Sequence, residues 1–271
     1  LLYPPENRGA AMGSIGLVIM FAPAIGPTLG GVILDVMSWR WLFFLVLPFM
    51  IMSILFAVIF LKNVSVITRP KVDVPSIILS TLGFGGIVYG LSNLGGRGSE
   101  EAMTVPMFIV YLILAIGVAS LFLFILMQLR SKEPMLDFRV FKYPVFSLAI
   151  MITIIAMMTL FSTLLLLPTY LQGALALSAM TAGLIMLPGG VLNGLFSPVA
   201  GKLFDKFGPR AMIIPGASLL VVIMYLFTQI TTSTSTLLII ILHSLMMIAI
   251  SMIMMPVQTN AMNGLAQHHY P

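Results

Sequence analysis

The sequence has 271 residues, of which 60% are hydrophobic and 8% are charged. A soluble domain carries roughly 25% charged residues, so this composition excludes water as the main solvent of the chain. The net charge of +5 does not indicate nucleic-acid binding, because the basic residues fall in short connectors between apolar stretches.

Several apolar segments are long enough to cross a bilayer as helices, which takes about 20 residues. They lie at about 11–34, 40–61, 74–95, 104–129, 144–171, 178–200, 211–230 and 236–257. Between Val145 and Gly201 the chain has no Asp, Glu, Lys or Arg, so that interval alone holds two crossings. We therefore predict an all-α polytopic membrane protein with about eight transmembrane helices.

Lys and Arg residues set the predicted orientation, because positive residues beside short loops stay in the cytoplasm. With the N-terminus inside, Arg40 and Arg97 lie on the outer side and the other 11 of the 13 basic residues lie inside. Both ends of the sequence are then cytoplasmic. The chain starts at Leu1 without a signal-peptide pattern and closes on a polar connector at Pro271, so we expect truncation at both ends.

The first span carries a run of small residues and a proline: Gly13, Ala22, Gly26, Pro27, Gly30 and Gly31. Gly26 and Gly30 lie four apart and therefore on one helix face, where the absence of side chains lets another backbone approach closely. Pro27 adds a bend, and Gly31 widens the smooth strip. We interpret this face as a packing surface that can rock against a neighbouring helix.

At these residues the sequence resembles the major facilitator superfamily, whose exporters carry such a signature on the fifth helix. Ala22 departs from the family pattern, which usually has glycine there; the change from one small residue to another leaves the packing interpretation standing. The resemblance implies a major-facilitator-type helical bundle, here partial, and an antiporter that exports its substrate. The alternative is a generic small-residue helix contact.

A second motif joins two otherwise uncharged spans and includes Gly201, Asp205, Gly208 and Arg210. Gly208 before a proline permits a tight turn, and Asp205 can accept hydrogen bonds from a helix N-terminus or pair with Arg210. The motif resembles the cytoplasmic loop motif of the superfamily, which implies a gating role. The alternative is a loop that only satisfies the positive-inside rule.

The separation of the two motifs narrows the resemblance further. Five predicted spans lie between them, whereas a twelve-helix member would have three, so the sequence resembles the fourteen-helix drug:proton antiporter branch. This implies three regions: the end of the N-terminal half at 1–61, a central linker with an extra helix pair at 62–143, and an incomplete C-terminal half at 144–271.

Members of this family bind substrate near the bilayer midplane and use embedded carboxylates to carry protons. All acidic residues here map to connectors or span ends; Asp35 comes nearest to the membrane interior, and we expect it to pair with a charge at the interface. We predict five cavity-lining residues in the C-terminal half, because their side chains are polarizable or are isolated polar groups: Met157, Phe161, Ser162, Asn193 and His243.

The sequence thus predicts a secondary active transporter of the bacterial plasma membrane that exports hydrophobic or cationic drugs in exchange for protons by alternating access. It predicts no enzyme, no metal and no cofactor besides the proton gradient, because no HExxH, GxSxG or phosphate-binding motif is present and the chain has no cysteine. Its expected partners are lipid, drug-like molecules and protons, without nucleic acid, and no oligomeric state is assigned. The alternatives are a nutrient or metabolite carrier of the same family and a non-transporting membrane fragment.

Overall fold

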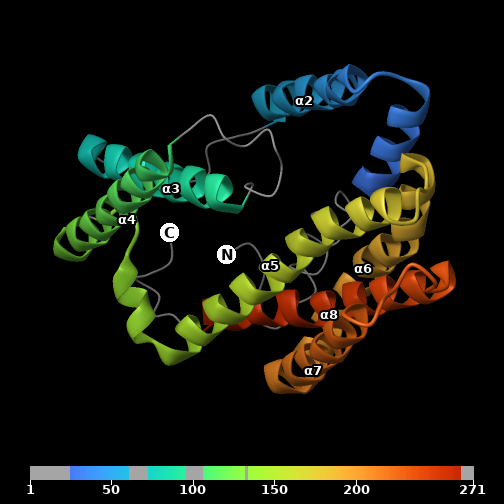
Figure 1. The fold of residues 1–271 in the computed structure, drawn as a ribbon. Coiled ribbons are helices and arrows are strands. Elements are labelled where there is room, and N and C mark those ends of the chain that lie inside the picture. Colours follow the sequence, from blue (N-terminus) through green and yellow to red (C-terminus); the bar gives the residue numbers. More distant parts are fainter. Residues whose placement is uncertain (1–24, 61–72, 96–105, 132–133, 264–271) are drawn as a thin grey trace. The chain divides into compact units, whose positions relative to one another are not determined.

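The computed structural model describes residues 25–60, 73–95, 106–131 and 134–263, with side chains up to residue 257, and the regular elements in these ranges are all helices (Figure 1). In chain order after the short apolar helix Ile25–Val36 they are α2 (Arg40–Phe60), α3 (Val74–Gly95), α4 (Met107–Arg130), the 3-10 helix η4 (Phe138–Lys142), α5 (Pro144–Gly173), α6 (Ala179–Phe207), α7 (Pro209–Phe227) and α8 (Thr236–Asn263).

Seven of the described helices, α2 to α8, are long and apolar enough to cross a membrane. The prediction of an all-α, multi-spanning protein is therefore confirmed. The first predicted span, 11–34, lies mostly outside the described residues, and its described part belongs to the helix Ile25–Val36.

Two helices extend more than one turn beyond the ends that the hydropathy pattern predicts. Helix α6 continues past residue 200 to Phe207, and α8 continues past residue 257 to Asn263. The charged residues at the end of α6 are compatible with a helix, which stops only where Gly208 takes a positive φ of 79°. Most of the predicted cytoplasmic connector is therefore the last turns of α6.

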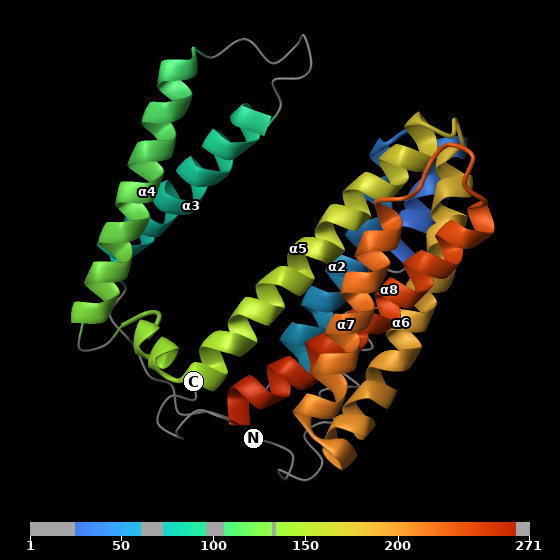
Figure 2. The same cartoon turned by 60° about the horizontal axis from the view of Figure 1, so that its bottom comes forward.

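The described residues fall into two compact units, 73–131 with 134–142, and 25–60 with 143–263. In the first unit α3 and α4 lie side by side (Figure 2). Glycines allow this close approach: a Cβ atom at Gly86 would lie 2.9 Å from the Cα of Gly117, and one at Gly117 would lie 2.8 Å from the backbone nitrogen of Ile87. The hairpin packs backbone against backbone, as small residues permit between membrane helices.

A buried polar network joins the ends of this hairpin. Ser76 donates to the carboxylate of Asp73 and accepts a hydrogen bond of 2.7 Å from Nε2 of Gln128. The side-chain oxygen of Gln128 in turn accepts from the backbone N–H of Leu136, 3.2 Å away. Because Ser76 and Gln128 are almost wholly buried, the satisfied network removes the cost of placing these groups in an apolar interior.

In the second unit α8 is the central helix, and it packs on α5, α6 and α7 (Figure 2). Its buried side chains include Met246, Ile250 and Ile253, which form the largest apolar cluster. By contrast, α2 has no buried residue in the described part of the chain. Its uniformly apolar surface fits a lipid environment.

Candidate functional site

The helix Ile25–Val36 touches the N-terminal half of α6 at backbone distance. A Cβ atom at Gly31 would overlap the carbonyl oxygen of Ala179, and one at Gly183 of α6 would lie 2.7 Å from the carbonyl oxygen of Pro27. Neither position can accept a side chain unless the two helices separate. Residues from before the central linker and after it therefore meet in a contact built on glycine.

Two hydrogen bonds hold this contact together. The hydroxyl of Thr28 donates to the carbonyl oxygen of Gly183 at 2.8 Å. One carboxylate oxygen of Asp35 accepts from the backbone N–H of Met180 at 3.2 Å, in the first turn of α6. A carboxylate is favourable there because the first N–H groups of a helix lack partners and carry partial positive charge.

Among the described residues Asp35 forms no ion pair, in contrast to the expected pairing with a charge at the interface. Asp35 caps α6, while the guanidinium of Arg40 lies 4.9 Å from the centroid of the Trp39 ring. The nearness of Arg40 in the sequence suggested an ion pair. In the fold, Asp35 instead accepts from the backbone N–H of Met180, which lies 145 positions further along the chain.

Of the three glycines of the predicted packing surface that the structure describes, one meets α6 at backbone distance. Gly31 faces α6, but a Cβ at Gly26 would meet no atom of the described residues within 4 Å, and one at Gly30 would meet only a Leu42 side chain at 3.9 Å. Gly26, Gly30 and Gly31 all line a cavity of about 380 Å³ that is bounded by α5 and α6. Gly13 lies outside the described residues.

The predicted gating motif turns the chain from α6 into α7 within one residue. Gly201 is buried in α6, Asp205 lies exposed in its last turns, and Gly208 takes φ 79° and ψ 174° before Pro209 starts α7. The backbone N–H of Gly208 donates to the carbonyl oxygen of Phe204 at 2.8 Å. Among the described residues Asp205 forms no ion pair with Arg210, which was one of the two partners that the sequence offered it.

We expect Gly208→Ala to destabilise this turn. The observed φ and ψ belong to a region that only glycine adopts readily, and a side chain there costs about 1–3 kcal/mol. Thermal unfolding of the purified protein should show a lower midpoint for Gly208→Ala. Gly173→Ala is the matched control, because its Cβ meets no atom within 4 Å in the described residues, and an equal loss in both variants would contradict the assignment.

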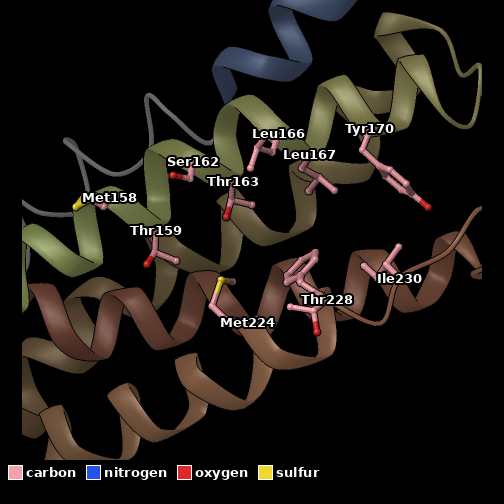
Figure 3. A pocket seen from close by; sticks show the side chains of 11 residues that line it. Met158, Thr159, Ser162, Thr163, Leu166, Leu167, Tyr170, Met224, Thr228 and Ile230 are labelled. Atoms are coloured by element: carbon pink, nitrogen blue, oxygen red, sulfur yellow. The ribbon is translucent and has the colours of Figure 1, made fainter. Parts of the chain in front are cut away.

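A second cavity of about 510 Å³ lies between α5 and α7. Its lining residues are Met158, Thr159, Ser162, Thr163, Leu166, Leu167, Tyr170, Met224, Phe227, Thr228 and Ile230. Thr163, Leu167 and Tyr170 point from α5 toward Met224 and Ile230 (Figure 3).

Several hydroxyl groups of this cavity donate their protons to the protein, so that they offer acceptor lone pairs to a ligand. Thr159 donates to the carbonyl of Ile155 at 2.9 Å, and Thr228 donates to the carbonyl of Tyr225 at 2.6 Å. Each hydroxyl oxygen keeps lone pairs after donating its proton. The cavity is therefore an apolar chamber with hydroxyl acceptors on two walls.

The structure brings only Ser162 of the five predicted candidates to this cavity. Met157 packs partly against the core around α8, and Phe161 is 58% exposed on the outside of α5. Asn193 and His243 are buried between α6 and α8. The residues that were missed include Thr159 and Thr163. Thr159 lies three positions before Ser162 and four before Thr163, so its helical face borders both.

No carboxylate of the described residues lies in the middle of a span, because Asp35, Asp73, Asp137 and Asp205 all stand at or near helix ends. The described residues also contain no group of three or more His, Asp or Glu side chains that could hold a metal ion. The candidate site therefore has two parts, the glycine contact with α6 and the cavity between α5 and α7.

Comparison with known proteins gives one matching family and several relatives. The family model described as Major Facilitator Superfamily matches residues 1–271. The lincomycin resistance protein LmrB of Listeria monocytogenes is 52% identical over all of this chain, which covers 56% of that relative. LmrB of Bacillus subtilis is 53% identical with the same coverages, and the probable multidrug resistance protein EmrY of Escherichia coli is 30% identical over 78% of this chain and 40% of its own length. The chain thus spans about half the length of these relatives.

Proposed function

The chain belongs to the Major Facilitator Superfamily of membrane transporters, and from this premise we propose that it forms part of an exporter that expels drug-like molecules in exchange for protons. Family membership makes it a multi-pass transporter and not an enzyme. Two relatives that share half of its residues are named for lincomycin resistance, which favours an antibiotic or similar xenobiotic as the exported substrate.

The observation that carries the proposal is the glycine contact between the helix Ile25–Val36 and α6. Transporters of this kind expose a central site alternately to the two sides by rocking one half against the other. A contact without side chains, held by Thr28 and Asp35 at its two ends, can open and close without repacking a core. This supports its use as the surface on which the halves move.

The cavity between α5 and α7 supports the substrate class. Methionine and phenylalanine provide adaptable, polarizable walls, and the hydroxyl oxygens accept from N–H groups or attract a cation. A nutrient carrier for hydrophilic substrates would place charged groups in its site, and no charged residue of the described part of the chain lines this cavity. Apolar cations or neutral drugs therefore fit better than polar metabolites.

Efflux measurements test the proposal directly. We expect cells that produce the full-length exporter to retain less ethidium and tolerate more lincomycin than empty-vector cells. A protonophore should abolish the difference, because only the proton gradient drives the exchange. Everted vesicles given ATP with a collapsed gradient serve as the control. Ethidium retention and lincomycin tolerance that both match the empty vector would contradict drug export, and efflux that survives the protonophore would contradict proton exchange.

A further inference from the structure

Helices α6 and α8 share a buried polar seam that neither the glycine contact nor the α5–α7 cavity uses. We define the seam as Gly189, Asn193 and Ser197 of α6 with His243, Met247 and Ser251 of α8. Within each helix these residues are four apart and therefore lie on one face.

Two contacts fix how the two faces meet. The ring of His243 lies so close to Gly189 that a Cβ atom there would overlap its Nδ1, and Nδ2 of Asn193 donates to the sulfur of Met247 at 3.3 Å. Both pairs are 54 positions apart, and Ser197 and Ser251 continue the two faces with the same offset. The helices thus run parallel with their polar residues in register.

Five polar atoms in this seam have no hydrogen-bond partner among the described residues: Oδ1 of Asn193, Oγ of Ser197, both ring nitrogens of His243 and Oγ of Ser251. The side chains that carry them are at most 3% exposed. Polar groups in an apolar interior are nearly always paired, either with protein or with internal water. A seam that concentrates so many of them indicates a place for water.

We infer that this seam is an internal proton site, in which water between α6 and α8 delivers a proton to a ring nitrogen of His243. An O–H bond of the hydrated proton breaks and an N–H bond forms. When the imidazolium releases the proton, that N–H bond breaks and an O–H bond forms with water farther along the seam. The inference rests on the proposed proton-driven export. It supplies a titratable group in the middle of the described spans, where no carboxylate is placed.

No charged side chain of the described residues faces the seam from the elements that pack on α8. The charged residues of α6 and α7 are exposed near one end of these helices: Lys202, Asp205, Lys206 and Arg210. The remaining titratable groups are two tyrosines. Tyr225 of α7 is exposed, and the hydroxyl of Tyr170 of α5 donates to the carbonyl of Thr231. A proton on His243 would therefore be held by neutral oxygens alone. Weak holding suits a carrier, which has to release its proton in every cycle.

The seam also has a direction. Ser251 lies two turns after His243, about 12 Å along α8. The seam therefore runs from His243 toward the C-terminal ends of α8 and α6, and Gly201 lies near that end of α6. The orientation predicted from the basic residues places that end in the cytoplasm. Protons would then pass inward along the seam while drug moves outward.

His243→Gln in the full-length exporter tests the inference. Glutamine keeps a polar side chain of similar size but cannot take up a proton. We expect gradient-driven drug efflux to be lost, whereas exchange of drug between equal pools, which requires no net proton transfer, is retained. Gradient-driven efflux at the wild-type level in His243→Gln would overturn the inference.

A measurement on the wild type remains decisive if that variant does not fold. Hydroxyl-radical footprinting should oxidise Met247 through the adjacent water, while Met212, equally buried in the apolar cluster of Ala200 and Phe204, stays protected. Equal protection of Met247 and Met212 would overturn the inference. Wild-type export that does not depend on the proton gradient would instead contradict the proposed function. Oxidation of Met247 reports separately on whether the seam holds water.

Discussion

Replacing Gly31 with alanine is expected to lower drug efflux by about fivefold or more, with the exporter still present in the membrane. The new methyl group would overlap the carbonyl oxygen of Ala179, which is backbone and cannot turn aside. Overpacking of this kind costs about 1–3 kcal/mol, which corresponds to roughly a 5- to 150-fold change in an equilibrium. The free energy of the closed contact would rise by that amount. The measurement is the initial rate of energised ethidium efflux.

Gly30→Ala is the matched control for this variant. It adds the same methyl group to the same helix one position earlier, where the nearest atom of the described residues is a flexible Leu42 side chain at 3.9 Å. Efflux by Gly30→Ala should stay within about twofold of wild type, as expected for a surface change without a clash. A ranking in which Gly30→Ala loses more efflux than Gly31→Ala would refute the contact with α6.

Gly86→Ala is expected to loosen the hairpin of α3 and α4. Its methyl group would lie 2.9 Å from the Cα of Gly117 and 3.1 Å from the carbonyl oxygen of Ile113. Both neighbours are backbone, so the helices have to move apart at a cost of about 1–3 kcal/mol. Hydrogen–deuterium exchange in Val74–Gly95 and Met107–Arg130 should rise, and the thermal midpoint of the full-length protein should fall.

For the adjacent Gly85 we expect the opposite effect of alanine on hydrogen–deuterium exchange. A Cβ at Gly85 meets no atom of the described residues within 4 Å, and alanine in a helix interior is favoured over glycine by about 0.5–1 kcal/mol. Gly85→Ala should therefore leave exchange unchanged or lower it slightly. If both alanines raised exchange to the same extent, close backbone packing would not explain why Gly86 is a glycine.

Hydropathy was enough to predict where most helices lie. The predicted span 74–95 has the bounds of α3, and 40–61 differs from α2 by one residue. The end of α6 was missed because Lys202, Asp205 and Lys206 suggest a connector by their charge, although each of them is compatible with a helix. Charge sets where the membrane ends, whereas Gly208 sets where the helix ends.

The faces of the helices were harder to predict than their positions. Spacing along one helix shows which residues share a face, but the partner of that face is decided by packing between segments far apart in the sequence. For this reason Gly26, Gly30 and Gly31 were predicted to share one contact, although only Gly31 meets α6 at backbone distance. The meeting of Asn193 and His243 in one seam likewise depends on the register between α6 and α8, which neither helix encodes by itself.

A cross-link across the glycine contact tests most directly whether this contact moves during transport. Asp35→Cys and Met180→Cys occupy the two sides of an existing hydrogen bond, and the chain has no cysteine of its own. Joining the pair with a short bifunctional thiol reagent should stop energised drug efflux, and reduction should restore it, while either single variant treated alike keeps its efflux. Undiminished efflux from the fully cross-linked exporter would show that the contact stays closed throughout the cycle, and the proposed movement of the two halves on this surface would be wrong.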